Sequence, residues 1–279
     1  MNMKRVFALL LAALLLCGCT NTATPETEPI PTEATVAETQ APTETPTEPS
    51  TEAAAEVPTE PETTESETQP EDPEWLHSGI REDGSFDEGT LFIGDSLTYG
   101  MVLQYLTIYE RLGDARFMAI VGAPVGNFFS LQTLRPCDDY SCAYTWEFHG
   151  MNFASAVETA GDSVTAVYYM MGTNYDPQIT VESYVKIMEH ILEKCPNATI
   201  YLQLVPVAQV DYIPYEEINE IIRGVHAYYQ QQGQPRIMLI DTHTAIGDNL
   251  SDGIHLTLQG QENWYNAIVA FAEENNIPQ

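Results

Sequence analysis

Ser96 stands in the segment Gly94-Asp95-Ser96, directly after a short apolar run and before a stretch that can form a helix. A serine at such a strand-to-helix turn projects its hydroxyl beyond the sheet, and backbone N–H groups at the helix start can stabilise an oxyanion. The segment is therefore a candidate for a nucleophilic serine. The tripeptide is short and common, and the alternative is that Ser96 only caps the helix.

A serine hydroxyl is a poor nucleophile unless a neighbouring base removes its proton. The best candidate for that base is His255, which lies three residues after Asp252 and just before the last predicted helix. At this spacing one short turn can present both side chains, so that Asp252 binds one imidazole nitrogen while the other faces Ser96. The alternative is that Asp252 is a turn residue and His255 a surface group. His243 is a weaker candidate, because no acid lies at a matching offset.

Two further segments offer donors for an oxyanion. Asn174 follows an apolar run and Gly172, and its amide could donate an N–H to developing charge. Gly122 ends another run, and its backbone N–H could be a second donor. Gly126 lies close by, but we prefer Gly122 because it directly follows the predicted strand. Each segment alone is unspecific, since Gly and Asn are ordinary turn formers.

These segments are separated by apolar, β-rich runs that predict five strands. The runs are almost continuously hydrophobic, which is typical of strands buried on both faces of a parallel sheet. They cover residues 90–94, 116–121, 163–171, 198–205 and 236–241. Helical spacing of apolar residues follows Thr180, Pro214 and Thr257, and residues 97–109 can form a further helix.

Alternating strands and helices predict the α/β class, as a three-layer α/β/α sandwich with a five-stranded parallel sheet. In such sheets the site lies beyond the carboxyl ends of the strands, which is where all the candidate segments fall. Residues 123–150 have no clear periodicity, and we expect them to form a long, partly irregular excursion near the site.

Together the segments are specific, because they come in the right order and end on one edge of one predicted sheet. The sequence resembles the SGNH hydrolase superfamily, also called GDSL esterases and lipases, which is defined by four blocks carrying Ser, Gly, Asn and His. The first block resembles residues 92–98, the third 172–174 and the last 252–257, and the resemblance covers residues 88–274. The second block, around Gly122, is the weakest match.

The resemblance implies a flavodoxin-like fold and ester hydrolysis through an acyl-enzyme. Carried over by position, Ser96 is the nucleophile, His255 the base and Asp252 the acid that orients it. The oxyanion donors would be the backbone N–H groups of Ser96 and Gly122 and the side chain of Asn174. Asp95 is expected to be structural.

The N-terminal region reads as an export signal followed by a tether. Residues 1–18 have two basic residues, an apolar run and small residues, which is the layout of a secretory signal. Residues 19–74 are almost wholly Thr, Glu, Pro and Ala and cannot bury a core, so we expect a disordered tether. Residues 75–279 are expected to form the hydrolase domain.

The sequence Leu16-Cys17-Gly18-Cys19 resembles a bacterial lipobox, in which a cysteine after a small residue is lipidated. Cys19 fits because Gly18 precedes it. We therefore expect the protein to be exported and anchored to the outer face of the cell membrane by lipidated Cys19, with no other membrane contact. The alternative is cleavage and release.

Charge and cysteine content exclude several kinds of partner and site. Without the tether and the signal, 26 acidic and 8 basic residues remain, a net charge of −18. Nucleic acid is therefore an improbable partner, because phosphates need clustered Lys and Arg. No cluster has metal-ligand spacing, so we expect no metal and no cofactor. Cys137 and Cys142 could form a local disulfide, whereas Cys195 is expected to be a buried free thiol.

Related exported enzymes often remove acetyl groups from carbohydrates, so we expect an O-acetyl esterase acting on carbohydrate or cell-wall glycan. The alternatives are a lipase, lysophospholipase or thioesterase, with an acyl channel lined by Phe128, Phe129 and Leu131. An O-acyltransferase is also open, as is a non-catalytic surface lipoprotein that binds glycans.

Overall fold

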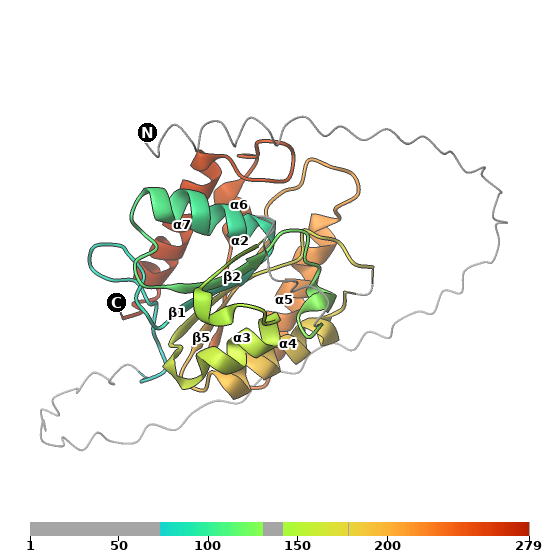
Figure 1. Ribbon diagram of the computed structural model, residues 1–279. Coiled ribbons are helices and arrows are strands. Elements are labelled where there is room, and N and C mark those ends of the chain that lie inside the picture. The colour runs from blue at the N-terminus through green and yellow to red at the C-terminus, as the bar shows by residue number, and fades with distance from the viewer. Residues whose placement is uncertain (1–72, 131–141, 178, 279) are drawn as a thin grey trace, which may run out of the picture. The chain divides into compact units, whose positions relative to one another are not determined.

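The computed structural model describes residues 73–130, 142–177 and 179–278, which belong to one compact unit (Figure 1). The signal, the tether as far as residue 72 (with Cys19), Leu131 and Cys137 lie outside the described residues, and so does the side chain of Cys142. Among the described residues, no helix has both the length and the apolar character needed to cross a membrane.

The unit is built on a six-stranded sheet in the order β3-β2-β1-β4-β5-β6. All neighbouring strands are parallel except β3, which runs antiparallel to β2. The strands are β1 (Thr90–Gly94), β2 (Arg116–Ile120), β3 (Cys142–Tyr144), β4 (Ala166–Met170), β5 (Thr199–Gln203) and β6 (Ile237–Ile240).

The five parallel strands confirm the predicted sheet, and their order is that of a flavodoxin-like fold. The edge strand β3 was not predicted, because it has only three residues and lies in the aperiodic excursion. The expectation that this whole excursion lies near the site is wrong for its second half, where Tyr144 pairs with Met118 inside β2.

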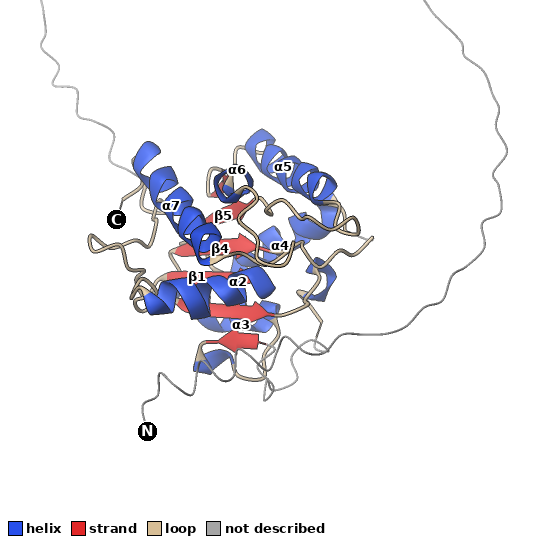
Figure 2. Ribbon diagram, turned by 90° about the horizontal axis from the view of Figure 1, so that it is seen from above, coloured by secondary structure: helices blue, strands red, loops and turns tan. Residues whose placement is uncertain are grey.

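Helices cover both faces of the sheet, as Figure 2 shows. One face carries α3 (Phe153–Ala160), α4 (Val181–Lys194) and α5 (Tyr215–Gln231). The other carries α2 (Ser96–Gly100), α6 (Thr242–Ile246) and α7 (Leu258–Glu274). The three-layer α/β/α sandwich is thereby confirmed.

Successive side chains of a strand pack into the hydrophobic cores on opposite faces of the sheet. In β1, Leu91 and Ile93 pack against the α4 side, whereas Phe92 packs against the α7 side, and every residue of the strand is buried. On the α7 side, Phe92, Tyr168 and Tyr201 form a continuous stack with ring centroids 5.2 and 4.7 Å apart. A strand buried on both faces has no polar side to show, which explains the continuous apolar runs.

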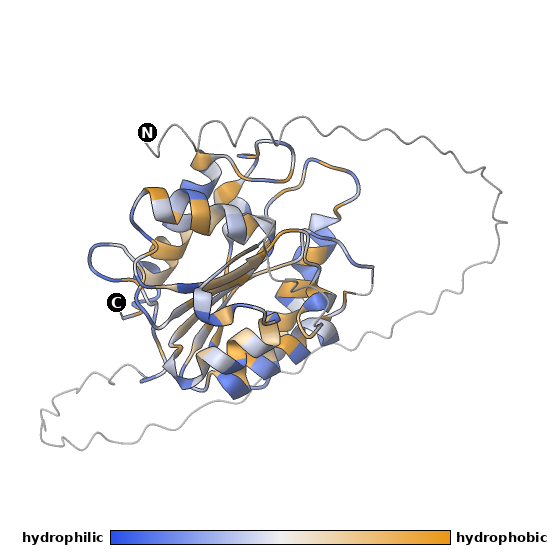
Figure 3. Ribbon diagram, in the orientation of Figure 1, coloured by the Kyte–Doolittle hydropathy of each residue, from blue (hydrophilic) through white to orange (hydrophobic). Residues whose placement is uncertain are grey.

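Capping residues fix where the long helices begin. The hydroxyl of Thr180 accepts from the backbone N–H of Ser183 at the start of α4, and Thr257 does the same for Gly260 in α7. Figure 3 shows the resulting amphipathic α4, with its apolar side toward the sheet and its hydrophilic side outward. These starts are the ones that the sequence predicted.

The helix after Ser96 differs from the expected single helix over residues 97–109. It begins as α2 and continues as a π-helical segment, Met101–Leu106. At its end the Thr107 hydroxyl donates to the carbonyl of Val102 at 2.7 Å, five residues back, which matches the wider π-helical repeat.

Candidate active site

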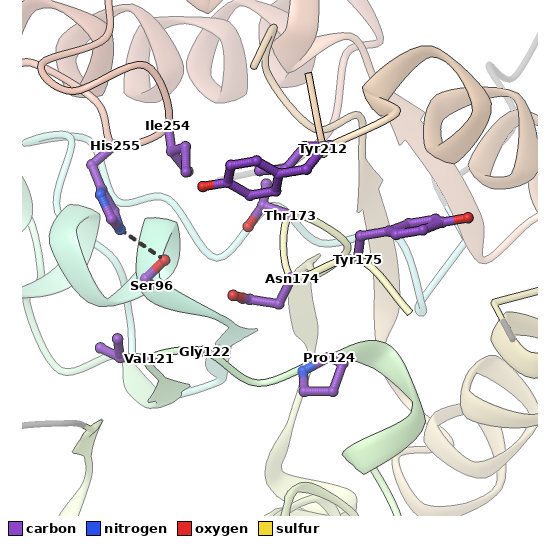
Figure 4. Close-up of a pocket in the computed structure, with 11 residues that line it drawn as sticks. Ser96, Val121, Gly122, Pro124, Thr173, Asn174, Tyr175, Tyr212, Ile254 and His255 are labelled. Carbon is purple, nitrogen blue, oxygen red and sulfur yellow. Dashed lines mark hydrogen bonds between the residues drawn. The ribbon is translucent and has the colours of Figure 1, made fainter. Parts of the chain in front are cut away.

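Four loops meet beyond the carboxyl ends of the parallel strands. Ser96 follows β1, Gly122 follows β2, Asn174 follows β4, and His255 lies in the turn before α7. All four line one pocket, shown in Figure 4. The structure thus brings together residues that are up to 159 positions apart in the chain.

Ser96, His255 and Asp252 form a continuous chain of hydrogen-bonding groups. The Ser96 Oγ atom lies 3.1 Å from His255 Nε2, and His255 Nδ1 lies 2.7 Å from Asp252 Oδ2. A carboxylate can only accept here, so neutral His255 carries its proton on Nδ1 and leaves Nε2 free to accept from the serine hydroxyl. This arrangement can remove the hydroxyl proton during nucleophilic attack.

A tight turn holds the histidine and its acid in this geometry. Asp252 Oδ1 accepts from the backbone N–H groups of Ile254 and His255, at 3.0 and 2.7 Å. Gly253, between Asp252 and Ile254, has a φ of +89°, a backbone conformation that residues with a side chain rarely adopt. Partial burial acts to raise the pKa of Asp252, but hydrogen bonds from the His255 backbone and ring and from Ile254 prevail, and its pKa lies below the usual range.

Asp95 lies beside the nucleophile and is completely buried. Its Oδ1 atom accepts from the Leu97 N–H at 3.0 Å, which caps α2, and its Oδ2 atom accepts from the Thr173 hydroxyl at 2.6 Å. Burial raises the pKa of Asp95, against the lowering effect of hydrogen bonds from Thr173, Leu97 and the Gly172 backbone. Asp95 therefore links the loop of Ser96 to the loop of Asn174.

The predicted oxyanion donors stand on adjoining loops. Gly122 has φ of +76° in the turn after β2. The Asn174 amide donates to the carbonyl of Ala123 at 3.3 Å, which ties the two loops together. The amide NH₂ carries a second hydrogen. In Figure 4 the Asn174 side chain extends toward Ser96 with its amide oxygen at the near end. Gly126, the alternative to Gly122, does not line the pocket.

The pocket is an open hollow of about 580 Å³. Ser96 lies at its floor with only 9% of its surface exposed, whereas 46% of the His255 side chain is exposed. Among the described residues, its lining contains no Lys, Arg, Asp or Glu and consists of Ser96, Val121, Gly122, Pro124, Thr173, Asn174, Tyr175, Tyr212, Ile213, Ile254 and His255. A neutral ester group with its alcohol therefore suits this pocket.

The other histidines have structural partners away from the serine. His243 lies in α6, where Nδ1 is 3.1 Å from the carbonyl of Val205 and the ring stacks on Tyr215. His149 bonds the hydroxyl of Tyr144 at 2.7 Å and does not line the pocket.

Cys195 is a free, fully buried thiol, as predicted. Burial raises the pKa of Cys195 to about 12, so it is not a nucleophile at neutral pH. The described residues contain no group of three His, Cys, Asp or Glu side chains placed to hold a metal ion.

The pocket has an aromatic wall that was not predicted from the sequence. Tyr175 directly follows Asn174, and Tyr212 lies in the loop between β5 and α5. The position of Tyr175 next to a predicted donor was a usable signal. No comparable signal marked Tyr212, because its position depends on how its loop packs.

Comparisons with known proteins add only distant likenesses. No family model and no curated protein matches the sequence. Among solved structures, a family 3 carbohydrate esterase from Talaromyces cellulolyticus is 16% identical, with 68% of this chain and 99% of that chain covered and a TM-score of 0.45. A lipolytic protein of the G-D-S-L family from Veillonella parvula is 15% identical; the match covers 65% of this chain and 96% of that one, with a TM-score of 0.44.

A family 2 carbohydrate esterase from Clostridium thermocellum, solved with cellohexaose, is 15% identical; the match covers 67% of this chain and 64% of that one, with a TM-score of 0.48. At these identities, function has to be read from the geometry of the site itself.

Proposed function

We propose that this protein is a serine esterase of the SGNH type that cleaves carboxylic esters through an acyl-enzyme. The observation that carries the proposal is the Ser96–His255–Asp252 chain, with distances of 3.1 and 2.7 Å, at the floor of an open pocket. A bound ester carbonyl at Ser96 would be within reach of the predicted oxyanion donors.

The reaction proceeds in two steps. His255 takes the hydroxyl proton as Ser96 attacks the ester carbonyl, and the N–H groups of Ser96, Gly122 and Asn174 bind the oxyanion. His255 then gives the proton to the leaving alcohol, whose C–O bond breaks to leave acyl-Ser96 and free alcohol. Water, activated by His255, attacks the acyl-enzyme and releases the acid and the free serine.

We propose O-acetyl groups on carbohydrate as the substrate. The open pocket supports a bulky alcohol part rather than a long acyl chain. Phe128, expected to line an acyl channel in a lipase, is fully buried in the core, and neither Phe128 nor Phe129 lines the pocket.

Replacement of the nucleophile tests the esterase proposal. We expect Ser96→Ala to abolish both hydrolysis of acetyl esters and labelling by a fluorophosphonate, with an unchanged circular dichroism spectrum. Ser155→Ala, in α3 on the opposite face of the sheet, is the matched control and keeps both activities. Near-normal hydrolysis by folded Ser96→Ala protein would overturn the proposal.

We also propose that the enzyme is exported and held on the outer face of the cell membrane by a lipid on Cys19. The support is the position of Cys19 after Gly18, behind an apolar run. Labelled palmitate should be incorporated by the wild type and by Cys17→Ser, but not by Cys19→Ser. Equal labelling of both variants would contradict this assignment.

A further inference from the structure

Tyr212 is the more exposed of the two tyrosines in the pocket wall. It has 67% of its surface exposed, whereas the next residue, Ile213, is 4% exposed and packs in the core. A tyrosine ring in water gains nothing for the fold from this position. The loop is anchored by Ile213 and presents Tyr212 to solvent, as expected for a side chain that meets a ligand.

The loop of Tyr212 is fixed relative to the catalytic turn. The backbone N–H of Gln209 donates to the carbonyl of Gly253 at 2.8 Å, and Gly253 lies between Asp252 and His255. A shift of the Tyr212 loop would therefore pull on the turn that carries the base. This hydrogen bond gives the tyrosine a defined position over the pocket.

Tyr212 lies on the side of Ser96 where the alcohol must leave. His255 has to protonate the leaving oxygen, so the alcohol part of the ester lies within reach of Nε2. Figure 4 shows the Tyr212 ring on the same side of Ser96 as Ile254 and His255, with Gly122 and Pro124 on the other side. A flat alcohol group bound there would meet the tyrosine ring.

The described loops that line the pocket also carry charge of one sign. Residues 121–127, 172–177, 206–214 and 247–255 contain four acidic residues, Asp176, Asp211, Asp248 and Asp252, and no Lys or Arg. The whole domain is acidic as well. A polyanionic substrate would be repelled from this rim, and the repulsion would weaken as salt screens it.

We infer that Tyr212 binds the alcohol part of the ester, and that this part is an uncharged sugar unit stacked on the tyrosine ring. The C–H face of a sugar ring can pack on an aromatic ring, and the tyrosine hydroxyl can bond a sugar hydroxyl. Tyr175, 45% exposed on the same pocket, would extend the platform to a neighbouring sugar. The inference rests on the proposed esterase function.

The experiment compares two acetyl esters that differ only in the alcohol. Acetylated xylo-oligosaccharide has a sugar to stack, whereas vinyl acetate has no ring to lie on Tyr212. We expect Tyr212→Ala to lower the ratio of their kcat/KM values about three- to tenfold. Tyr212→Phe should keep most of the ratio, since the ring remains. Tyr109→Ala, which removes another exposed tyrosine that lies outside the pocket, should leave the ratio unchanged.

The charge of the substrate is tested with acetylated oligogalacturonate, which is anionic. Its kcat/KM should lie below that of the xylo-oligosaccharide at low salt and rise toward it as salt is added. An unchanged ratio in Tyr212→Ala, or faster cleavage of the anionic ester at low salt, would overturn the inference. Failure of the esterase proposal is distinguishable, because the wild type would then cleave neither acetyl ester, or Ser96→Ala would cleave vinyl acetate as fast as the wild type.

Discussion

Thr173 Oγ1 donates a hydrogen bond of 2.6 Å to Asp95 Oδ2, and both residues are buried. Each is the immediate neighbour of a predicted catalytic group, since Asp95 precedes Ser96 and Thr173 precedes Asn174. The bond therefore sets the position of the nucleophile relative to an oxyanion donor. A buried carboxylate suits this task, because it can accept from several N–H and O–H donors at once.

Replacing Asp95 by Asn should disturb this link. Asn has a single acceptor oxygen, and its NH₂ group would face donors, so we expect the free energy of unfolding to fall by about 1–3 kcal/mol. The rate of fluorophosphonate labelling should fall as well. Thr173→Val removes only one donor and should have the smaller effect on both. Equal labelling rates in wild type and Asp95→Asn would show that the link does not position Ser96.

Asp95 and Asp252 should have opposite effects on stability as pH changes. The pKa of Asp95 is raised above its ordinary 3.8, so the folded state binds its proton more tightly than the unfolded state. The stability of the wild type relative to Asp95→Asn should therefore fall as pH rises from 3.8 through that raised pKa.

For Asp252 the sign is reversed, because its folded-state pKa is lower than 3.8. Its contribution is complete above 3.8 and is lost as pH falls through the folded-state pKa. Urea unfolding of wild type, Asp95→Asn and Asp252→Asn across the acidic range measures both differences. Parallel pH curves for all three proteins would contradict these assignments.

Asp252→Ala should lower kcat for acetyl esters more than it changes KM. It removes the acceptor that holds the His255 Nδ1 proton and the two backbone N–H bonds of the turn. Correct general acid–base catalysis contributes about 10²–10⁴ in rate, and we expect a loss of at least roughly tenfold. Asp248→Ala, on the same loop but without a bond to His255, is the control. Comparable loss in both variants would mean that the loop matters rather than the carboxylate.

Much of this architecture is predictable because its determinants are local. Strands buried on both faces need continuous apolar runs, and Thr180 and Thr257 cap their helices through hydrogen bonds three residues away. The three-residue β3 has no such signal. The short α3 had one, since Asn152 caps it and accepts from the Ser155 N–H at 2.7 Å, but it lies within an aperiodic stretch.

The residues of the site also fall into two groups, those whose positions the sequence indicates and those whose positions depend on tertiary packing. Ser96 and Asn174 follow strands whose ends are visible in the sequence, so their meeting at one edge could be predicted. Tyr212 lies in a loop that is held by the buried Ile213 and by the bond from Gln209 to Gly253, a contact between segments far apart in the chain. Such contacts depend on tertiary packing, which periodicity and turn signals do not encode.

Gly94, the last residue of β1, should tolerate no side chain. A Cβ atom there would lie 1.9 Å from Thr98 Oγ1 and 2.5 Å from the carbonyl oxygen of Met170 on the neighbouring strand. We expect Gly94→Ala to lower the free energy of unfolding by about 1–3 kcal/mol, because this packed region can relax only by shifting backbone. Gly100→Ala is the control, with its nearest contact at 3.3 Å on a side-chain amide.

A double variant measures how much of this clash the Thr98 hydroxyl causes. Thr98→Ala removes the hydroxyl that meets the new Cβ atom, but it leaves the Thr98 Cβ atom and the Met170 carbonyl oxygen, each 2.5 Å from the new atom. Gly94→Ala/Thr98→Ala should therefore recover only part of the lost stability in thermal unfolding. Gly94 also sets the backbone just before Asp95 and Ser96. Labelling by fluorophosphonate should therefore be slower in Gly94→Ala than in the wild type, and it should remain slow in the double variant. Full recovery of both the stability and the labelling rate would show that β1 can shift away from β4 without moving the nucleophile.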